Sequence, residues 1–439
     1  MARKTLNLQY AKLIRKMTAM GVGLLLGAVS LLSLTCWSAE ATGITRRPTQ
    51  ADNSIPALQG AAAITYLQEQ KLTARDGVQG DIFGDAVAVS GSTLVVGAHG
   101  DNNAQGAAYV FNRQGGNWVE TQKLTASDGA AGDQFSDSVA VSGSTIVVGA
   151  PFKTIGGHLF QGAVYVFERQ GGRWAETQSL TESDGVAFFG GSVAVSGSTI
   201  VVGGIVNNRV SIFERHGGSW VETQKLTASD AAPSDVFGKS VAVSGSTIVV
   251  GASGDNVGSN VHQGSVYVFQ RQGGSWVEIQ KLTASDGETF DTFGNAVTVS
   301  GSTVVVGASL DSIGGNSFQG AAYVFVRQDG IWIETQKLTA SDGAAVDLFA
   351  ESVAVSGSTI VVGAPSDDVG GIFDQGSAYI FERHGGSWVD TQKLTANDGR
   401  SLDLFGQSVA ISGSTVVVGA PFVDIGGNLA QGAAYVFEP

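Results

Sequence analysis

The sequence is short of the residues that would tie a fold together covalently or attract nucleic acid. Its single cysteine, Cys36, has no partner in the chain, which excludes an internal disulfide. Lysine and arginine number 25 against 39 aspartates and glutamates, and the formal net charge is −14. An acidic surface repels phosphate backbones and anionic lipid headgroups, so nucleic acid is not expected as a partner. Cations and basic protein surfaces suit this charge better.

Helical periodicity is lacking too, and a repeat takes its place. The motif QKLT, or QSLT in one copy, has its leucine at Leu72, Leu124, Leu180, Leu226, Leu282, Leu338 and Leu394. The intervals are 52, 56, 46, 56, 56 and 56 residues. Seven copies of a unit of this length indicate a repeat architecture, so one large domain is expected where the chain length alone would suggest several.

Each unit contains four short apolar runs separated by Gly-, Ser- and Asp-rich breaks, which is a strand pattern. In the copy that begins at Gln280, strand A is expected at 296–299, strand B at 303–308, strand C at 321–326 and strand D at 332–338. Four strands make one propeller blade, which must stack on its neighbours to bury both faces. We therefore predict an all-β, seven-bladed β-propeller of four-stranded antiparallel blades over residues 64–439.

The N-terminus differs in composition from the repeats. A basic segment precedes an apolar stretch from about Met17 to Trp37 and the tripeptide Ala39-Glu40-Ala41, which is typical of a secretory signal peptide over residues 1–41. The alternative is an uncleaved membrane anchor, because the apolar run approaches spanning length. Residues 42–63 are interpreted as a flexible linker.

Cleavage of the signal peptide would remove five basic residues and one acid, leaving 20 basic and 38 acidic residues and a net charge of −18. The mature protein is then expected to be secreted, periplasmic or at the cell surface. It is expected to be a monomer that does not insert into the membrane.

The first strand of the array is out of order. Tyr66 stands six residues before Leu72, where every later copy has a tryptophan, so a D strand precedes the first A strand. The chain ends straight after the seventh C strand. We expect the N-terminal strand to pair with the strand around 433–437 in the last blade, which would close the ring and remove an exposed sheet edge.

Aromatic residues hold fixed places in the unit. A phenylalanine opens strand A in all seven copies, and a tyrosine lies in strand C in six. Stacking onto sugars is one interpretation of such a stripe. Burial between blades is favoured, because these strands are apolar along nearly their whole length.

The Phe-Gly opening at Phe83-Gly84, Phe237-Gly238, Phe293-Gly294 and Phe405-Gly406, followed by Gly-Ala-Pro at 149–151, 363–365 and 419–421, resembles the FG-GAP repeat. The resemblance covers roughly residues 64–439 and implies the seven-bladed propeller of integrin α subunits and of many exported bacterial proteins. Integrin-type repeats often carry a calcium loop between strands A and B. Here that connection is only Ser-Gly-Ser-Thr, which has no carboxylate for a cation that needs six to eight oxygens. The copies more closely resemble the short bacterial form of the repeat.

Acidic residues gather instead in the D–A and B–C loops, which the topology of an up-and-down blade places on one face. They are Asp76, Asp81, Asp128, Asp133, Asp230, Asp235, Asp286, Asp291, Asp342, Asp347, Asp398 and Asp403 in the D–A loops, and Asp101, Asp255, Asp311, Asp367 and Asp424 in the B–C loops. Two carboxylates five residues apart, with a third from a neighbouring loop, could bind Ca²⁺, the one candidate cofactor. The favoured alternative is that these aspartates cap turns by accepting hydrogen bonds from backbone N–H groups.

The third copy departs most from the unit. Two residues are missing from its D–A loop and eight from its B–C loop, and the second copy has Lys153 where other copies have a B–C aspartate. We expect a low, less acidic notch in the rim, with Lys153, Asn207, Asn208 and Arg209 as candidate ligand contacts. Neutral deletion explains the same difference, because loops tolerate it.

Catalytic motifs are also lacking. The histidines His99, His158, His216, His262 and His384 are expected in exposed loops on opposite faces, and their spacing matches no metal or nucleophile–base motif. Near-equivalent aspartate pairs in six copies argue against one specialised catalytic dyad. We therefore predict an exported, non-enzymatic binding or adhesion propeller that recognises a protein or glycan, at the cell surface or matrix, through its acidic loop face. The alternative is a carbohydrate-active enzyme, a glycan hydrolase or lyase, on the same scaffold.

Overall fold

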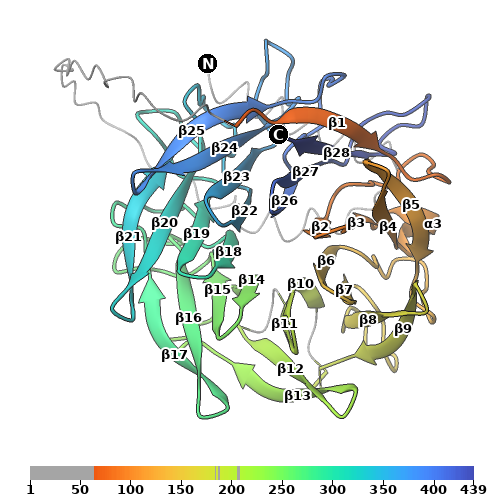
Figure 1. Ribbon diagram of the computed structural model, residues 1–439. Helices are drawn as coiled ribbons and strands as arrows, with labels where there is room; N and C mark the ends of the chain where they lie inside the picture. Colours follow the sequence, from red (N-terminus) through yellow and green to blue (C-terminus); the bar gives the residue numbers. More distant parts are fainter. Residues whose placement is uncertain (1–63, 183, 186–187, 205–207) are drawn as a thin grey trace. The chain divides into compact units, whose positions relative to one another are not determined.

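The computed structural model describes residues 64–182, 184–185, 188–204 and 208–439. From Thr65 onward, the described residues form seven four-stranded antiparallel sheets arranged around a centre (Figure 1). The predicted all-β, seven-bladed propeller is confirmed. The predicted signal peptide (1–41) and linker (42–63) lie outside the described residues. No helix among the described residues is long and apolar enough to cross a bilayer.

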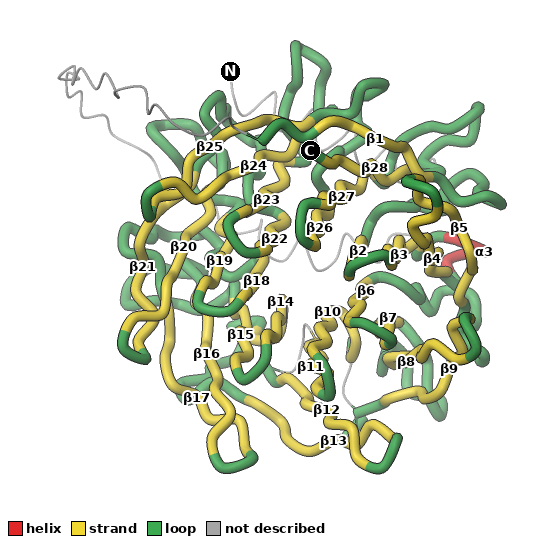
Figure 2. The backbone as a smooth tube through the Cα atoms, viewed as in Figure 1, coloured by secondary structure: helices red, strands yellow, loops and turns green. Residues whose placement is uncertain are grey.

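In every blade strand A lies nearest the centre and strand D farthest from it, as Figures 1 and 2 show. The A strands of blades 1 to 7 are β2 (Val87–Ser90), β6 (Ser138–Ser142), β10 (Phe189–Ser196), β14 (Phe237–Ser244), β18 (Ala296–Ser300), β22 (Ser352–Ser356) and β26 (Ser408–Ser412). The B strands are β3 (Thr93–Ala98), β7 (Thr145–Ala150), β11 (Thr199–Gly204), β15 (Thr247–Ala252), β19 (Thr303–Ala308), β23 (Thr359–Ala364) and β27 (Thr415–Ala420).

The C strands, in the same order, are β4 (Ala107–Gln114), β8 (Ala163–Gln170), β12 (Val210–His216), β16 (Ser265–Gln272), β20 (Ala321–Gln328), β24 (Ser377–His384) and β28 (Ala433–Glu438). The D strands are β5 (Asn117–Leu124), β9 (Arg173–Leu180), β13 (Ser219–Leu226), β17 (Ser275–Leu282), β21 (Ile331–Leu338), β25 (Ser387–Leu394) and, for blade 7, β1 (Leu67–Leu72). The C and D strands extend beyond the expected ranges because only two residues separate them.

The A–B and C–D connections are tight turns of two kinds. Gly91 has φ +55° and begins a two-residue A–B turn whose flanking residues Ser90 and Thr93 pair directly. Glycine at this first turn position is what a type II′ hairpin requires. The C–D turn of blade 1 has positive φ at both Gly115 and Gly116, as a type I′ hairpin requires. The A–B turn recurs in all seven blades and the C–D turn in blades 1 to 6, so the face that carries them is nearly uniform.

The outer strands of neighbouring blades are joined by a glutamine clamp. The Gln70 side-chain amide donates to the carbonyl of Trp118 and its Oε1 accepts from the Trp118 N–H, at 2.7 and 2.8 Å. The same two bonds join Gln392 of β25 to the backbone of Tyr66, which precedes β1. β1 itself pairs antiparallel with β28, with Leu72 opposite Ala434. Glutamine side chains of the outermost strands thus bond to the backbone of the neighbouring blade.

The hydrophobic core lies between blades. In one cluster Phe83, Tyr109 and Trp118 of blade 1 pack with Val417 and Val436 of blade 7. The rings of Phe83 and Tyr109 meet edge to face with centroids 5.5 Å apart, and both side chains are fully buried. Burial of each such side chain contributes about 2–3 kcal/mol. The expectation that the aromatic stripe is core is confirmed, because these rings have no face open to a sugar.

Candidate functional site

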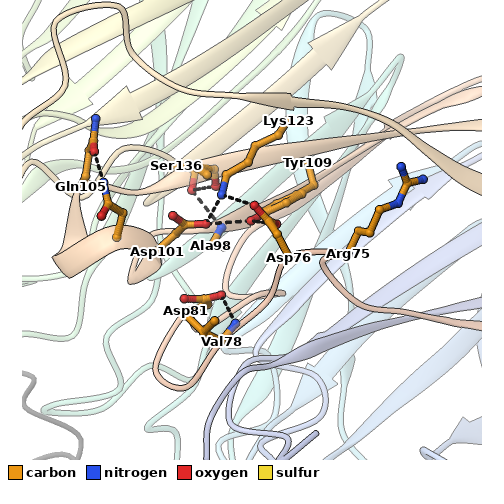
Figure 3. Close-up of polar contacts among 12 residues, drawn as sticks. Arg75, Asp76, Val78, Asp81, Ala98, Asp101, Gln105, Tyr109, Lys123 and Ser136 are labelled. Atoms are coloured by element: carbon orange, nitrogen blue, oxygen red, sulfur yellow. Dashed lines mark hydrogen bonds and ion pairs between the residues drawn. The ribbon is translucent and has the colours of Figure 1, made fainter. Parts of the chain in front are cut away.

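The D–A and B–C loops of each blade meet above strands C and D, where four side chains form one network. In blade 1 strand pairing sets Tyr109 directly opposite Lys123. The Tyr109 hydroxyl, which has one proton to donate, lies within hydrogen-bond distance of Asp76 Oδ1 and Asp101 Oδ2, at 2.8 and 2.7 Å. Lys123 Nζ lies 2.8 Å from Asp76 Oδ2 and 2.6 Å from Asp101 Oδ2. Figure 3 shows both carboxylates turned toward the lysine and the tyrosine.

The same network recurs in blades 4, 5 and 6. Its members are Asp230, Asp255, Tyr267 and Lys281; Asp286, Asp311, Tyr323 and Lys337; and Asp342, Asp367, Tyr379 and Lys393. The B–C aspartate is buried in each case, whereas the D–A aspartate is about half exposed. A buried carboxylate is costly unless it is paired and hydrogen-bonded, and each of these is both.

The network holds its charges firmly. Burial is the largest single influence on Asp76 and raises its pKa, but hydrogen bonds from Lys123 and Tyr109 outweigh it and bring the pKa below its usual value. Burial lowers the pKa of Lys123, yet hydrogen bonds to Asp101 and Asp76 raise it overall. The pKa of Tyr109 is also raised, first by burial and then by the two carboxylates. The aspartate therefore stays ionised and the lysine protonated across the physiological range.

The second aspartate of each D–A loop has a different role. Asp81 Oδ2 accepts a hydrogen bond from the backbone N–H of Val78 at 2.7 Å, and the equivalent aspartates of blades 2, 4, 5, 6 and 7 do the same within their own loops. Burial raises the pKa of Asp81 and Asp291 to about 6 and that of Asp347 to about 7. This geometry is the turn-capping arrangement that the sequence favoured.

The geometry bears directly on the predicted calcium sites. A calcium ion shared by Asp76 and Asp101 would have to lie between their carboxylates, where Lys123 Nζ already contacts both. The ammonium donates hydrogen bonds to both carboxylates and offsets one of their two negative charges. Calcium binding stays a prediction, and the arrangement favours the alternative in which these aspartates are structural.

One predicted site residue is out of register. Asp424 was expected to be the B–C aspartate of blade 7, but its Oδ1 accepts from the backbone N–H of Ala430, the loop bond that Asn256 makes in blade 4. The residue equivalent to Asp255 is Val423, which is buried in the core. The acidic network of blade 7 therefore contains Asp398, with Tyr435 and Lys71 as partners, and lacks a B–C aspartate.

Blade 2 carries the same kind of network with its cation in another place. Strand pairing sets Tyr165 opposite Ser179, so the usual lysine is missing from strand D. Lys153 enters from the B–C loop instead, and its Nζ lies 3.1 Å from Asp133 Oδ2 and 3.3 Å from Asp128 Oδ1. Its side chain is only 8% exposed. Lys153, predicted as a ligand contact, is thus occupied inside the blade.

Blade 3 replaces the tyrosine by Ser211, and a second cation compensates. Arg209 Nε lies 2.6 Å from Oε1 of the buried Glu182, and its Nη1 lies 3.1 Å from Asp184 Oδ2. Lys225 Nζ also pairs with Asp184 at 2.5 Å. Arg209, like Lys153, was predicted as a ligand contact and has partners inside its own blade.

The remaining predicted contacts of the notch have equally local surroundings. Asn208 donates to the carbonyl of Ala232 at 2.6 Å and accepts from the N–H of Phe237 at 3.0 Å, which ties the shortened loop to blade 4. In other blades a backbone carbonyl of the longer B–C loop accepts the equivalent N–H. Asn207 lies outside the described residues.

Apolar side chains also gather at the notch. Phe152 and Phe160 of the blade 2 B–C loop meet Phe188 of the blade 3 D–A loop, with Phe152–Phe188 and Phe160–Phe188 centroids 5.3 and 5.9 Å apart. All three rings are half-buried, and Leu159 beside them is 69% exposed. We call these four residues the blade 2–3 patch. This patch was not predicted, although Phe152 and Leu159 differ from Leu310 and Ser317 at the same positions of the copy that begins at Gln280.

Blade 1 also has a short B–C loop, which was not predicted. Asn102 and Asn103 have φ of 51° and 60°, so the segment α3 (Asp101–Ala104) is a left-handed turn, a conformation that asparagine tolerates better than most residues. Below it is a hollow of about 370 Å³ lined by Asp76, Val78, Asp101, Asn102, Gln105, Gly106, Lys123 and Thr125. The hollow opens onto the network of blade 1.

One histidine was wrongly expected to be exposed. His99 directly follows β3, and its side chain is 12% exposed. Its Nδ1 lies 3.2 Å from Asp85 Oδ2, beside Asp137 of blade 2. Residues 85, 99 and 137 are far apart in the sequence, so no spacing motif could have indicated this cluster.

With the geometry described, the chain can be compared with known proteins. A family profile described as FG-GAP repeat matches seven times, over residues 66–111, 118–167, 174–215, 220–269, 276–325, 332–381 and 388–437. The chain has no match among curated proteins.

Two solved structures share the fold at low sequence identity. A protein described as a "putative 6-phosphogluconolactonase" from Bacteroides uniformis is 13% identical, with a TM-score of 0.50 over 72% of this chain and 86% of that one. A protein of the same description from Bacteroides fragilis is 12% identical, with a TM-score of 0.49 over 72% and 85%. At such identity the likeness concerns the fold alone.

Proposed function

This chain belongs to the FG-GAP repeat family, and from that premise we propose that it is an exported, non-enzymatic binding module that recognises a protein or glycan through its D–A and B–C loops. The observation that carries the proposal is the contrast between its two faces. The A–B and C–D face consists of near-identical two-residue turns. The loop face carries exposed apolar side chains whose size and loop position vary among the blades: Val78, Leu159, Val261, Ile372 and Leu429.

The charged residues of the loop face support a binding function more than catalysis. Each aspartate of the repeated network is bonded to lysine and tyrosine, or to a backbone N–H of its own loop. A glycan hydrolase needs one carboxyl as acid and another as base or nucleophile, both turned toward the substrate. The repeated aspartates point toward internal partners, so the alternative of a carbohydrate-active enzyme draws no support from them.

The blade 2–3 patch is the part of the face best suited to contact a partner. Half-buried aromatic rings and an exposed leucine, rimmed by acidic loops, match a protein surface that combines apolar and basic residues. A glycan would use the same rings by stacking. We do not expect these loops to need calcium, because in the regular blades an internal ammonium group already bonds both carboxylates of the network.

A capture experiment tests the proposal. The purified protein, immobilised, is exposed to envelope or matrix extracts with Ca²⁺ or with chelator, and captured partners are compared for wild type, L159D and the control S144D. Ser144 is exposed in the A–B turn of the same blade. Capture by wild type and S144D with loss in L159D supports the proposal. Capture that S144D abolishes and L159D leaves intact would place recognition on the other face and contradict it.

A further inference from the structure

The residue that follows Phe-Gly, or its variant, varies more than any other at the centre of the propeller. It lies near the start of strand A, the innermost strand of each blade, either one or two residues before the strand or as its third residue (Figure 1). The seven residues are Asp85, Asp137, Gly191, Lys239, Asn295, Glu351 and Gln407. Residues at this position in adjacent blades can touch, because Asn295 Nδ2 donates to Glu351 Oε2 at 3.1 Å. In a chain of near-identical repeats, such divergence at one position needs an explanation.

Two carboxylates occupy this position in neighbouring blades only between blades 1 and 2. The boundary also has His99, at a position taken by Pro151, Ser253, Ser309, Pro365 and Pro421 in the other described copies. One ligand atom from each of Asp85, His99 and Asp137 can be chosen so that all three lie within 4.8 Å of one another. Among the described residues this is the one such cluster of histidine, aspartate or glutamate side chains.

The histidine is the nitrogen ligand of the cluster. His99 Nδ1 is buried and lies 3.2 Å from Asp85 Oδ2, and this ion pair falls short of hydrogen-bond geometry within the described part of the chain. A metal ion would replace the contact between the two side chains. The cluster is therefore more than a group of acids, because it places a buried imidazole beside two carboxylates.

The spacing and donor set fit a metal ion. Ligand atoms at about 2.1 Å from a shared ion lie at most about 4.2 Å apart, so a shift of less than about 1 Å would bring all three atoms into contact with it. One imidazole and two carboxylates suit borderline divalent ions such as Zn²⁺, and the imidazole disfavours Ca²⁺ and Mg²⁺, which prefer oxygen. Two aspartates and a neutral histidine also balance the charge of a divalent ion.

We propose that Asp85, His99 and Asp137 form a binding site for one divalent transition-metal ion between blades 1 and 2, at the inner end of the loop face. Three protein ligands leave at least one coordination position to water or to a ligand that enters from solvent. The site is independent of the blade 2–3 patch and of the repeated lysine network. Loss of the metal site would not remove the patch or the network, and loss of either of these would not remove the metal site.

Titration of the chelator-treated, tag-free full-length protein with Zn²⁺ tests the site. Calorimetry should show one ion per chain, and Zn²⁺ should raise the melting temperature, because a ligand that binds only the folded state stabilises it. H99A, D85N and D137N should each weaken binding by at least about tenfold, since loss of even an outer-shell partner costs a metal site about 10–100-fold. The two asparagine variants keep the side-chain shape and so separate metal loss from misfolding.

The matched control is H216A. His216 is exposed and lies 4.0 Å from Glu214, which makes it an alternative surface site for Zn²⁺. H216A should retain wild-type affinity, and Co²⁺ should give a visible absorption band that is present in H216A and absent in H99A. No Zn²⁺ binding by the wild type, or binding retained within twofold in D85N, D137N and H99A, would overturn the proposal.

Discussion

Blades 4 to 6 and blades 2 and 3 achieve the same packing with different side chains. The regular blades have a lysine on strand D, a tyrosine on strand C and aspartates in both loops. Blade 2 moves the cation from Ser179 on strand D to Lys153 in the B–C loop. Blade 3 loses the tyrosine and gains Arg209 with Glu182. What all blades keep is a cation paired with the first aspartate of the D–A loop, above strands C and D.

A second compensation joins blades 3 and 4. In most blades the glycine of the D–A loop packs against a glutamine from the preceding B–C loop, and a Cβ at Gly287 would lie 2.2 Å from Gln263 Nε2. Blade 4 has Ala231 at this position, and the shortened loop of blade 3 brings no glutamine to it. The two positions thus change together: where the glutamine is missing, the glycine is replaced as well.

The largest expected effect comes from breaking the relocated pair. K153D places three carboxylates in blade 2 with no cation, and loss of one partner from a buried ion pair costs about 3–5 kcal/mol. Chemical denaturation should show this decrease in the free energy of unfolding.

The double variant K153D/S179K supplies the matched control. It rebuilds the arrangement of blades 4 to 6 inside blade 2, with the lysine opposite Tyr165. Most of the lost stability should return, and the two substitutions should show a coupling energy above about 2 kcal/mol. If the double variant is as unstable as K153D, the two kinds of blade do not share one network.

A pH experiment separates the two aspartates of a regular blade. Burial raises the pKa of Asp347 to about 7, whereas its pKa in the unfolded chain is about 3.9. Between these values the folded state binds the extra proton, so Asp347 adds stability at low pH that is lost as pH rises from about 4 to 7. D347N removes this dependence. Relative to wild type, its unfolding free energy should rise between pH 5 and pH 8 by roughly 2–3 kcal/mol.

The first aspartate should give the opposite trend. Although burial raises the pKa of Asp342, hydrogen bonds from Lys393 and Tyr379 lower it overall, so its contribution is present above the unfolded pKa and is lost as pH falls. D342N should therefore lose less stability than wild type below about pH 4. Parallel pH profiles for wild type and D347N would contradict the assignment of the second aspartate.

A smaller effect tests the contact between glutamine and glycine. G287A should destabilise the protein by about 1–2 kcal/mol, because the buried Gln263 cannot move aside freely. The matched change A231G should cost under about 1 kcal/mol, since it affects mainly the unfolded chain. Equal effects of G287A and A231G on the melting temperature would show that the coupling between these positions is not real.

The fold was predictable because seven copies in register fix the strand order, the turn chemistry and the aromatic core. The site was predictable only in part. Lys123 is an unremarkable member of QKLT until strand pairing sets it opposite Tyr109. Asp424 was predicted to be the B–C aspartate of blade 7, whereas the equivalent position holds the buried Val423. The cluster around His99 depends on contact between two blades, which a repeat comparison within one unit does not show.

The central claim is that an internal lysine ammonium takes the place of a metal ion between the loop carboxylates. Calcium titration of wild type and K337M side by side tests it most directly. Lys337 Nζ lies 2.8 Å from both Asp286 and Asp311, and methionine keeps the length of the side chain without its charge. Calorimetry and thermal unfolding at millimolar Ca²⁺ should show no binding heat and no change in melting temperature for the wild type, with any response confined to K337M. Saturable calcium heat in the wild type, equal to or larger than that of K337M, would contradict the account.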